Sequence, residues 1–175
     1  CSLLENFDIS NNFLTSHGMK SVAAMLKGCH QIREVHVCDD DSNSSGTSEL
    51  LASLANKQHL ERLHCGFVVS GAAHNLQTMV NLKDLSISFA GTYFGFLCTH
   101  LRGLPCLSKF SLKCKKGLCL ESDQHLADLL RSLTQLREFD LNIFSSASSF
   151  EHLGAYLGSS DCRLTKLSIY GRSEE

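Results

Sequence analysis

The sequence has no tryptophan, a single proline, and no run of about 18 apolar residues, the length that a membrane-spanning helix needs. It therefore predicts no transmembrane segment, and no charged-then-apolar signal segment opens the chain. Lys and Arg number 16 against 18 Asp and Glu, so the basic excess of a nucleic-acid or anionic-membrane surface is also missing. Because the chain begins at Cys1 rather than Met, we expect a piece of a longer protein, from which a targeting signal could have been lost.

Cysteine is abundant, with nine residues in 175, and the number is odd. A small secreted disulfide scaffold is usually shorter and has a weaker apolar pattern than this chain. Several cysteines, Cys65 among them, stand where the pattern requires an apolar residue, and free cysteine behaves as a small hydrophobe. We therefore expect reduced cysteines and a cytoplasmic location.

One short pattern recurs along the whole chain: an apolar residue, two variable residues, an apolar residue, one variable residue, and an apolar residue. Its seven copies start 28, 28, 22, 25, 29 and 28 residues apart, which chance does not easily produce. The alternation within each copy predicts a short strand. The copies begin at Leu4, Ile32, Leu60, Leu82, Leu107, Leu136 and Leu164.

Between the copies, a polar or glycine-containing loop is followed by apolar residues at helical spacing. A strand and a helix every 22 to 29 residues are typical of a leucine-rich repeat, in which neither half buries its apolar side alone. We therefore predict one α/β domain over residues 1–175 with seven strands and about six helices. It should be a solenoid, or horseshoe segment, with a parallel sheet on its concave face and helices on its convex face. The clearest helices are expected around residues 19–26, 50–54, 126–133 and 153–157.

The longer units, and above all residues 4–26 (LENFDISNNFLTSHGMKSVAAML), resemble leucine-rich repeats of the ribonuclease-inhibitor type. Such repeats also form the C-terminal sensor arms of NOD-like receptors, and the irregular lengths here are more similar to those arms than to the regular inhibitor. The resemblance covers essentially the whole chain and is specific for fold rather than for function. The short third copy and the enlarged loop at 38–48 predict irregularity, with loops rather than regular turns after residues 38, 66 and 88.

The third, fifth and seventh residues of each copy are predicted to lie on the concave face, because the apolar residues point into the core. In the third position the sign of the charge alternates at every step after the first copy, and neighbouring side chains of a parallel sheet lie about 4.8 Å apart. Two interpretations are open: a self-satisfied surface ladder, with each ion pair worth about 0–1 kcal/mol, or a charged track that binds a partner. We favour the ladder, because cancelling charges give little long-range field. The third-position residues are Asn6, Glu34, Arg62, Asp84, Lys109, Glu138 and Lys166.

The other two rows are small and polar. Protein-binding hot spots favour Trp, Tyr and Arg, and this face offers only Arg62 and, at its far end, Tyr170. The fifth-position residues are Asp8, His36, His64, Ser86, Ser111, Asp140 and Ser168; the seventh-position residues are Ser10, Cys38, Gly66, Ser88, Lys113, Asn142 and Tyr170. The candidate protein-binding residues are Glu34, His36, Arg62, His64, Asp84, Lys109, Lys113, Glu138, Asp140, Lys166 and Tyr170.

An apolar group near the short repeats could also be exposed for binding. Core packing is the favoured interpretation, because short units need bulk to fill the space left by a reduced helix. Its members are Phe67, Phe89, Tyr93, Phe94 and Phe96.

Four residues of adjacent strands, His36, Cys38, His64 and Cys65, could supply the N and S ligands that zinc prefers. Cys65 occupies a core position while the two histidines face outwards, so we predict no zinc site. The two histidines could instead respond to pH near neutrality, which is a hypothesis at this stage.

Other chemistry is not indicated. The pair Cys114 and Cys119 fits a strand end followed by a loop better than a redox motif, and the acidic run Asp39–Asp41 lacks the Gly and Glu that a calcium loop requires. No P-loop, G-x-S-x-G or H-E-x-x-H motif is present. We therefore expect no cofactor and no enzymatic activity.

The resemblance implies protein recognition within an innate-immune sensor of the NOD-like receptor type, where such arms bind ligands or hold the receptor autoinhibited. A protein partner or a microbial ligand is then expected, without nucleic acid or membrane. Two alternatives stay open: an F-box-type substrate adaptor of a ubiquitin ligase, and a stoichiometric enzyme inhibitor. Because the end copies lack the polar caps that solenoids need, we also expect truncation, a partner or self-association at the ends.

Overall fold

A computed structural model describes residues 2–12, 14–37, 44–68, 70–89, 94–114, 120–143 and 150–171 of the chain. Five sequence predictions fall outside these residues: those for Cys38, Asp39–Asp41, Tyr93 and Cys119, and most of the loops expected after residues 38 and 88. The side chain of Phe67 also lies outside the description.

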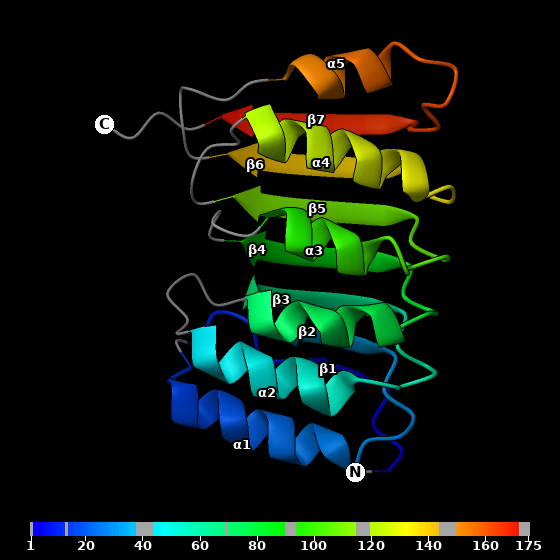
Figure 1. Cartoon of the computed structure of the whole chain (residues 1–175). Coiled ribbons are helices and arrows are strands. Elements are labelled where there is room, and N and C mark those ends of the chain that lie inside the picture. Colours follow the sequence, from blue (N-terminus) through cyan, green and yellow to red (C-terminus); the bar gives the residue numbers. More distant parts are fainter. Residues whose placement is uncertain are drawn as a thin grey trace.

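Strands and helical segments alternate along the described chain in the order that the repeated pattern predicts (Figure 1). The predicted helices are confirmed, although each begins earlier than its apolar residues because its first turn is largely polar. Among the described helices, none is both long and apolar enough to cross a membrane. The strands are β1 (Asn6–Asp8), β2 (Glu34–Val37), β3 (Arg62–Val68), β4 (Asp84–Phe89), β5 (Lys109–Cys114), β6 (Glu138–Ile143) and β7 (Lys166–Gly171). The helical segments are α1 (Ser16–Lys27), α2 (Ser44–Leu54), the 3-10 helix η1 (Ser70–Thr78), α3 (Phe94–Leu101), α4 (Leu120–Ser132) and α5 (Glu151–Leu157).

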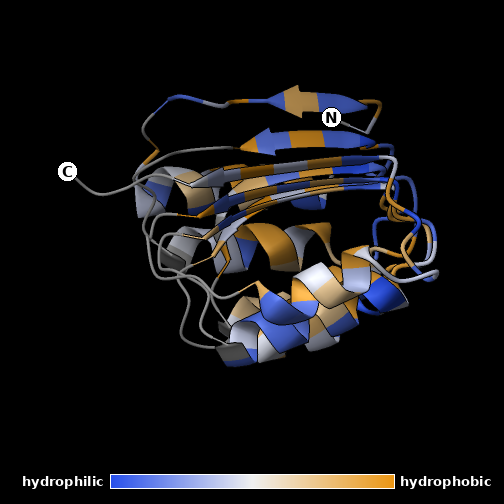
Figure 2. Cartoon of the chain, turned by 90° about the horizontal axis from the view of Figure 1, so that it is seen from above, coloured by the Kyte–Doolittle hydropathy of each residue, from blue (hydrophilic) through white to orange (hydrophobic). Residues whose placement is uncertain are grey.

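The seven strands form one parallel sheet in which each strand pairs with the strands of the neighbouring repeats, in sequence order. Parallel strands require crossover connections, and here each crossover carries a helical segment. All the helical segments lie over the same side of the sheet (Figures 1 and 2). We call the other side the open face, since no described element covers it. The expected α/β alternation with a parallel sheet is therefore confirmed.

The repeats are joined by one backbone arrangement, which recurs at the start of the strands. The carbonyl oxygen of Arg33 accepts hydrogen bonds from the N–H groups of Glu61 and Arg62, with N···O distances of 2.8 and 3.0 Å. The same pair of bonds occurs at all six junctions between strands, with N···O distances from 2.7 to 3.1 Å. The accepting residue is always the second of its repeat: Glu5, Arg33, Glu61, Lys83, Ser108 and Arg137. Every repeat thus starts in the same register.

The core lies between the sheet and the helical segments. Phe110 and Phe139, on neighbouring strands, are fully buried and stack with ring centroids 5.5 Å apart. The cysteines at apolar positions are buried as predicted, and burial raises the pKa of the Cys98 and Cys114 thiols to about 12. Because the thiolate is the reactive form, these two cysteines act as small core hydrophobes. The buried free cysteines of the described chain are Cys29, Cys65, Cys98 and Cys114.

The third repeat departs from the others because only 22 residues separate its start from the next. Its helical segment is the tighter 3-10 helix η1, and its strand has a register shift between Cys65 and Phe67. The extra residue of this β-bulge puts Phe67 rather than Gly66 opposite Ser88. The prediction that Gly66 belongs to the open-face row is therefore wrong, and Gly66 is buried. The prediction of a loop directly after residue 66 is also wrong, because β3 continues to Val68.

The phenylalanines near the short repeats divide between core and surface. Phe89 and Phe94 are buried with ring centroids 5.8 Å apart, so core packing is confirmed for both. Phe96 is 46% exposed and packs edge-to-face on His100 at 4.5 Å, so core packing is wrong for this residue. Two residues correspond to about 200° around a helix, which turns Phe96 away from the side that buries Phe94.

Apolar residues are exposed at both ends of the sheet. Leu167 and Ile169 occupy in β7 the positions that Phe139 and Leu141 fill in β6, yet they are 37% and 43% exposed, whereas the β6 pair is fully buried. Leu3, before β1, is 85% exposed. Within the described residues, neither end of the sheet is therefore covered by a polar cap, in line with the sequence prediction.

The close approach of α1 and α2 depends on Gly46. A Cβ atom at this position would lie 2.5 Å from the Cβ of Met19 and 2.7 Å from its Cγ. The two helices would have to separate, and overpacking of this kind costs about 1–3 kcal/mol. We expect Gly46→Ala to lower the free energy of unfolding by about that amount in a denaturant titration.

Gly154→Ala in α5 is the matched control, because the Cβ that it would add has no atom of the described residues within 4 Å apart from its chain neighbours and the nearby backbone of α5. Alanine favours a helix over glycine, so this variant should keep or slightly raise stability. Equal losses in the two variants would contradict a steric role for Gly46.

Candidate protein-binding face

The open face carries a row formed by the third residue of each repeat. Strand pairing puts these residues directly opposite one another on adjacent strands, as predicted. We call the six charged members the charge row: Glu34, Arg62, Asp84, Lys109, Glu138 and Lys166.

Within the charge row, the ions associate in pairs rather than as a continuous ladder. Each cation contacts the acid of the preceding strand. Among the described residues, no ion pair joins Arg62 to Asp84 or Lys109 to Glu138. The register gives every inner charge two opposite neighbours, but each head group engages only one of them within the row. The pairs are Arg62–Glu34 at 2.8 Å, Lys109–Asp84 at 3.8 Å and Lys166–Glu138 at 3.7 Å.

A second series of ion pairs, not among the predicted rows, runs along the start of the first four strands. Arg33 lies 3.7 Å from Glu5 and 3.5 Å from Glu61, whose other oxygen is 3.0 Å from the Lys83 Nζ. The Lys83 hydrogen bond, above all, holds the pKa of Glu61 below its ordinary value. These are the second residues of their repeats, and their alternating sign was visible in the sequence. Strand alternation did not assign them to a face, because they precede the strands.

The fifth-position row brings His36 and His64 together, with ring centroids 4.3 Å apart and planes tilted by 34°. His64 Nε2 lies 3.2 Å from Asp84 Oδ1, which links the histidines to the charge row. His36 Nε2 is buried without a hydrogen-bond partner in the described protein. Asp8 lies opposite His36, and the Ser10 N–H, which donates to Asp8 at 2.9 Å, is the main cause of its lowered pKa.

Asp84 is the most enclosed acid of the charge row, with 17% of its side chain exposed. Burial alone would raise the pKa of Asp84. The hydrogen bond with His64 and the charges of His64, Lys109 and Arg62 outweigh burial and hold this pKa below its ordinary value of 3.8. Asp84 is therefore a carboxylate that the folded state stabilises.

The seventh-position row is continuous only in the second half of the sheet. Ser88, Lys113, Asn142 and Tyr170 lie opposite one another in register. Tyr170 is 58% exposed, and Asn142 Oδ1 beside it is buried without a hydrogen-bond partner in the described chain. Asp140, two residues before Asn142 on the same face of β6, makes no ion pair with the described residues. We call Asp140, Asn142 and Tyr170 the β6–β7 patch.

The residues considered as zinc ligands do not converge where the structure describes them. Cys65 is 2% exposed and belongs to the core, while His36 and His64 lie on the open face. Within the described part of the chain, no group of three His, Cys, Asp or Glu residues is arranged to hold a metal ion.

Known sequences add nothing to these observations, since no protein-family model and no curated protein matches the chain. The capacity of the open face to bind a partner depends on its own side chains. Most of its charges are satisfied within the face, whereas the β6–β7 patch and His36 retain unused hydrogen-bonding groups.

The Arg62–Glu34 pair is the shortest of the charge row and tests whether the row stabilises the fold. In a double-mutant cycle with Arg62→Ala and Glu34→Ala, we expect a coupling energy of about 0.2–1 kcal/mol, because both side chains are partly exposed. The coupling should shrink in about 1 M salt, which screens surface charges. Zero coupling at low salt would contradict a stabilising role for this ion pair.

Asp84 should make stability depend on pH in the acid range. Because its folded-state pKa is lowered, it stabilises the protein above its unfolded-state pKa of about 4, and this contribution is lost as pH falls through the folded-state pKa. Asp84→Asn is thus expected to lower the free energy of unfolding by about 1–2 kcal/mol at pH 7. The difference from wild type should shrink as pH falls below about 4, the unfolded-state pKa.

Asp140→Asn is the control for this experiment, since Asp140 lies on the same face without an ion pair to the described residues. It should lower the free energy of unfolding at pH 7 by less than Asp84→Asn does, because no ion pair with the described residues is lost. A difference for Asp84→Asn that stays constant from pH 7 to about pH 3 would contradict an electrostatic cause.

Proposed function

We propose that this chain is a leucine-rich-repeat solenoid that recognises a protein partner through its open face. The regular alternation of one strand and one helical segment per repeat supports the solenoid. Helices pack about 10 Å apart and strands about 4.8 Å apart. Because all the helical segments lie on one side and need more space per repeat than the strands, the stack is expected to curve into a horseshoe with the open face on its concave side.

The observation that carries protein recognition is the β6–β7 patch. It combines an exposed tyrosine with Asn142 Oδ1, a buried acceptor without a partner among the described residues. An unpaired buried polar atom costs about 1–3 kcal/mol, and a donor from a partner would remove that cost. Tyrosine is a favoured anchor of protein interfaces. The internally paired charge row would add orientation and specificity more than affinity.

The biological setting that we infer is the sensor arm of a cytoplasmic innate-immune receptor of the NOD-like type. Similarity of the repeats to such arms supports it, and it implies a protein or microbial ligand or an autoinhibitory contact. In that setting the chain has no enzymatic role. The domain organisation of the full-length gene tests this part alone: a P-loop nucleotide-binding domain upstream supports it, whereas an F-box or neither domain would contradict it.

Binding through the open face can be tested with two exposed aromatic residues on opposite sides of the sheet. Tyr170→Ala, alone and with Asn142→Ala, should reduce binding of a purified candidate partner by about tenfold or more. Phe96→Ala on α3 is the matched control, because Phe96 is 46% exposed on the helix side. It should leave the dissociation constant unchanged in calorimetry or surface-plasmon measurements.

Candidates for that measurement are the proteins that the wild-type chain retains from an extract. Loss of binding with Phe96→Ala but not with Tyr170→Ala would place the interface on the helices and contradict the proposal. Melting curves of the single variants Tyr170→Ala and Phe96→Ala should match that of wild type, since both aromatic residues are exposed.

A further inference from the structure

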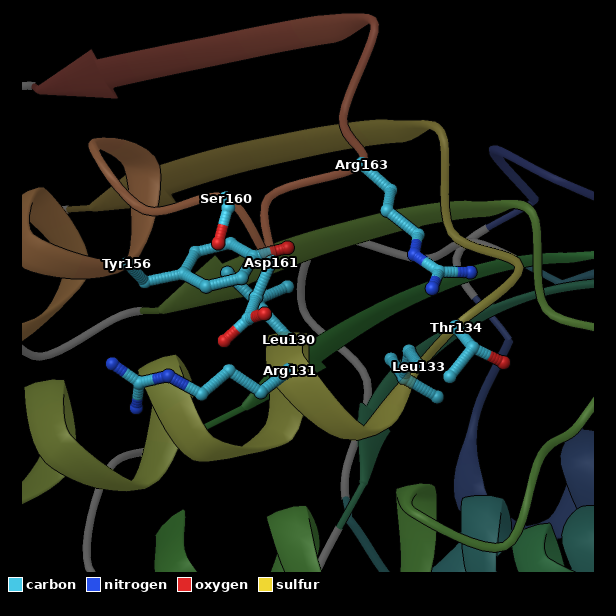
Figure 3. Close-up of a pocket in the computed structure, with 8 residues that line it drawn as sticks. All are labelled: Leu130, Arg131, Leu133, Thr134, Tyr156, Ser160, Asp161 and Arg163. Atoms are coloured by element: carbon cyan, nitrogen blue, oxygen red, sulfur yellow. The ribbon is translucent and has the colours of Figure 1, made fainter.

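The helix side of the sheet contains a cavity of about 160 Å³ between the end of α4, the end of α5 and the turn that leads to β7 (Figure 3). Its floor is buried and apolar, formed by Leu130, Leu133 and the ring of Tyr156. Its rim is exposed and polar. The rim residues are Arg131, Thr134, Ser160, Asp161 and Arg163.

The floor is held by a contact between the two helices. Asp123 of α4 is fully buried, and its carboxylate accepts hydrogen bonds from the backbone N–H groups of His152 and Leu153 at 2.7 and 3.1 Å. It therefore caps the first turn of α5 from a neighbouring helix. This contact fixes α5 on α4, and so fixes Tyr156 in the floor of the cavity.

The two arginines of the rim differ in their surroundings. Arg131 is engaged, with its Nη1 3.0 Å from Asp128 Oδ1 and its guanidinium 5.8 Å from the centre of the Tyr156 ring. Arg163 extends toward Thr134, whereas Asp161 points toward Leu130 and Arg131 (Figure 3). Neither Arg163 nor Asp161 forms an ion pair with any residue that the structure describes. The rim thus presents one available cation and one available anion.

Size and charge together restrict the ligand. The cavity is smaller than the roughly 300–1,000 Å³ of pockets for drug-sized ligands, but it has room for several water molecules. A singly charged ligand would engage Arg163 or Asp161 and leave the other without a counter-ion. A ligand with both charges would engage both groups.

We propose that this cavity binds a small zwitterion the size of a free amino acid. The ligand carboxylate lies toward Arg163 and the Thr134 hydroxyl, its ammonium lies toward Asp161, and its carbon skeleton rests on Tyr156. Guanidinium and carboxylate can form two parallel hydrogen bonds, which favours this orientation. Because the rim is exposed to water, the affinity should be about millimolar. The site is on the opposite side of the sheet from the proposed protein-binding face and does not depend on that function.

The test is a titration of the intact chain, followed by NMR chemical shifts, with three related probes. L-alanine carries both charges, N-acetyl-L-alanine lacks the ammonium, and L-alaninamide lacks the carboxylate. We expect saturable binding of L-alanine and dissociation constants about tenfold or more higher for the two blocked probes. Equal binding of either blocked probe, or no saturable binding of L-alanine, would overturn the proposal.

Two variants locate the binding. Arg163→Gln and Asp161→Asn should each weaken L-alanine binding by about tenfold while leaving the melting temperature unchanged, because both residues are exposed and unpaired within the described chain. Lys20→Gln and Glu49→Gln are the charge-matched controls on α1 and α2, at the far end of the sheet (Figure 1). Equal weakening by the controls would show a general effect of charge and overturn the assignment.

Discussion

The rest of the structure depends on one backbone contact, in which the second carbonyl of each repeat accepts two N–H groups from the next repeat. It occurs at all six junctions with nearly the same geometry. Apolar packing supplies most of the energy of such a core, but packing alone is not directional. The paired bonds fix where each strand begins, and a slip of one residue would turn every apolar side chain to the open face. The backbone hydrogen bonds therefore set the register of the strands, while burial of the apolar side chains supplies most of the stabilising free energy.

This fixed register determines which polar residues are tolerated between the apolar ones. Residues at the same position of successive repeats become neighbours about 4.8 Å apart, so like charges would repel along the whole sheet. The second and third positions avoid this by alternating in sign over much of their length, and ion pairs form at both. Many of the charged side chains on this surface therefore form ion pairs with the neighbouring repeat. The β6–β7 patch differs because its hydrogen-bonding groups lack partners within the described chain.

Much of the fold and the charge row could be predicted from the sequence. Apolar residues alternate with a period of two in each strand, and the copies are regularly spaced. These two features specify the sheet, the order of its strands and the charge row. Where the structure differs from the sequence predictions, the cause is local and does not appear in the repeat pattern. The bulge at Gly66 adds one residue to one strand, and the exposure of Phe96 depends on the rotational setting of α3. The cavity is formed by side chains of α4, α5 and the turn before β7, and only the folded chain brings these together.

Both candidate sites lie in the last three repeats, near one exposed end of the described sheet. The inner side of β7 is uncovered at Leu167 and Ile169, and α5 has only seven residues. A short helix is marginal on its own, so the position of α5 depends on the Asp123 cap and on Tyr156. The cavity beside Tyr156 therefore depends on this contact between α4 and α5. A ligand in the cavity would contact both α4 and α5, and would thereby stabilise the position of α5 on α4.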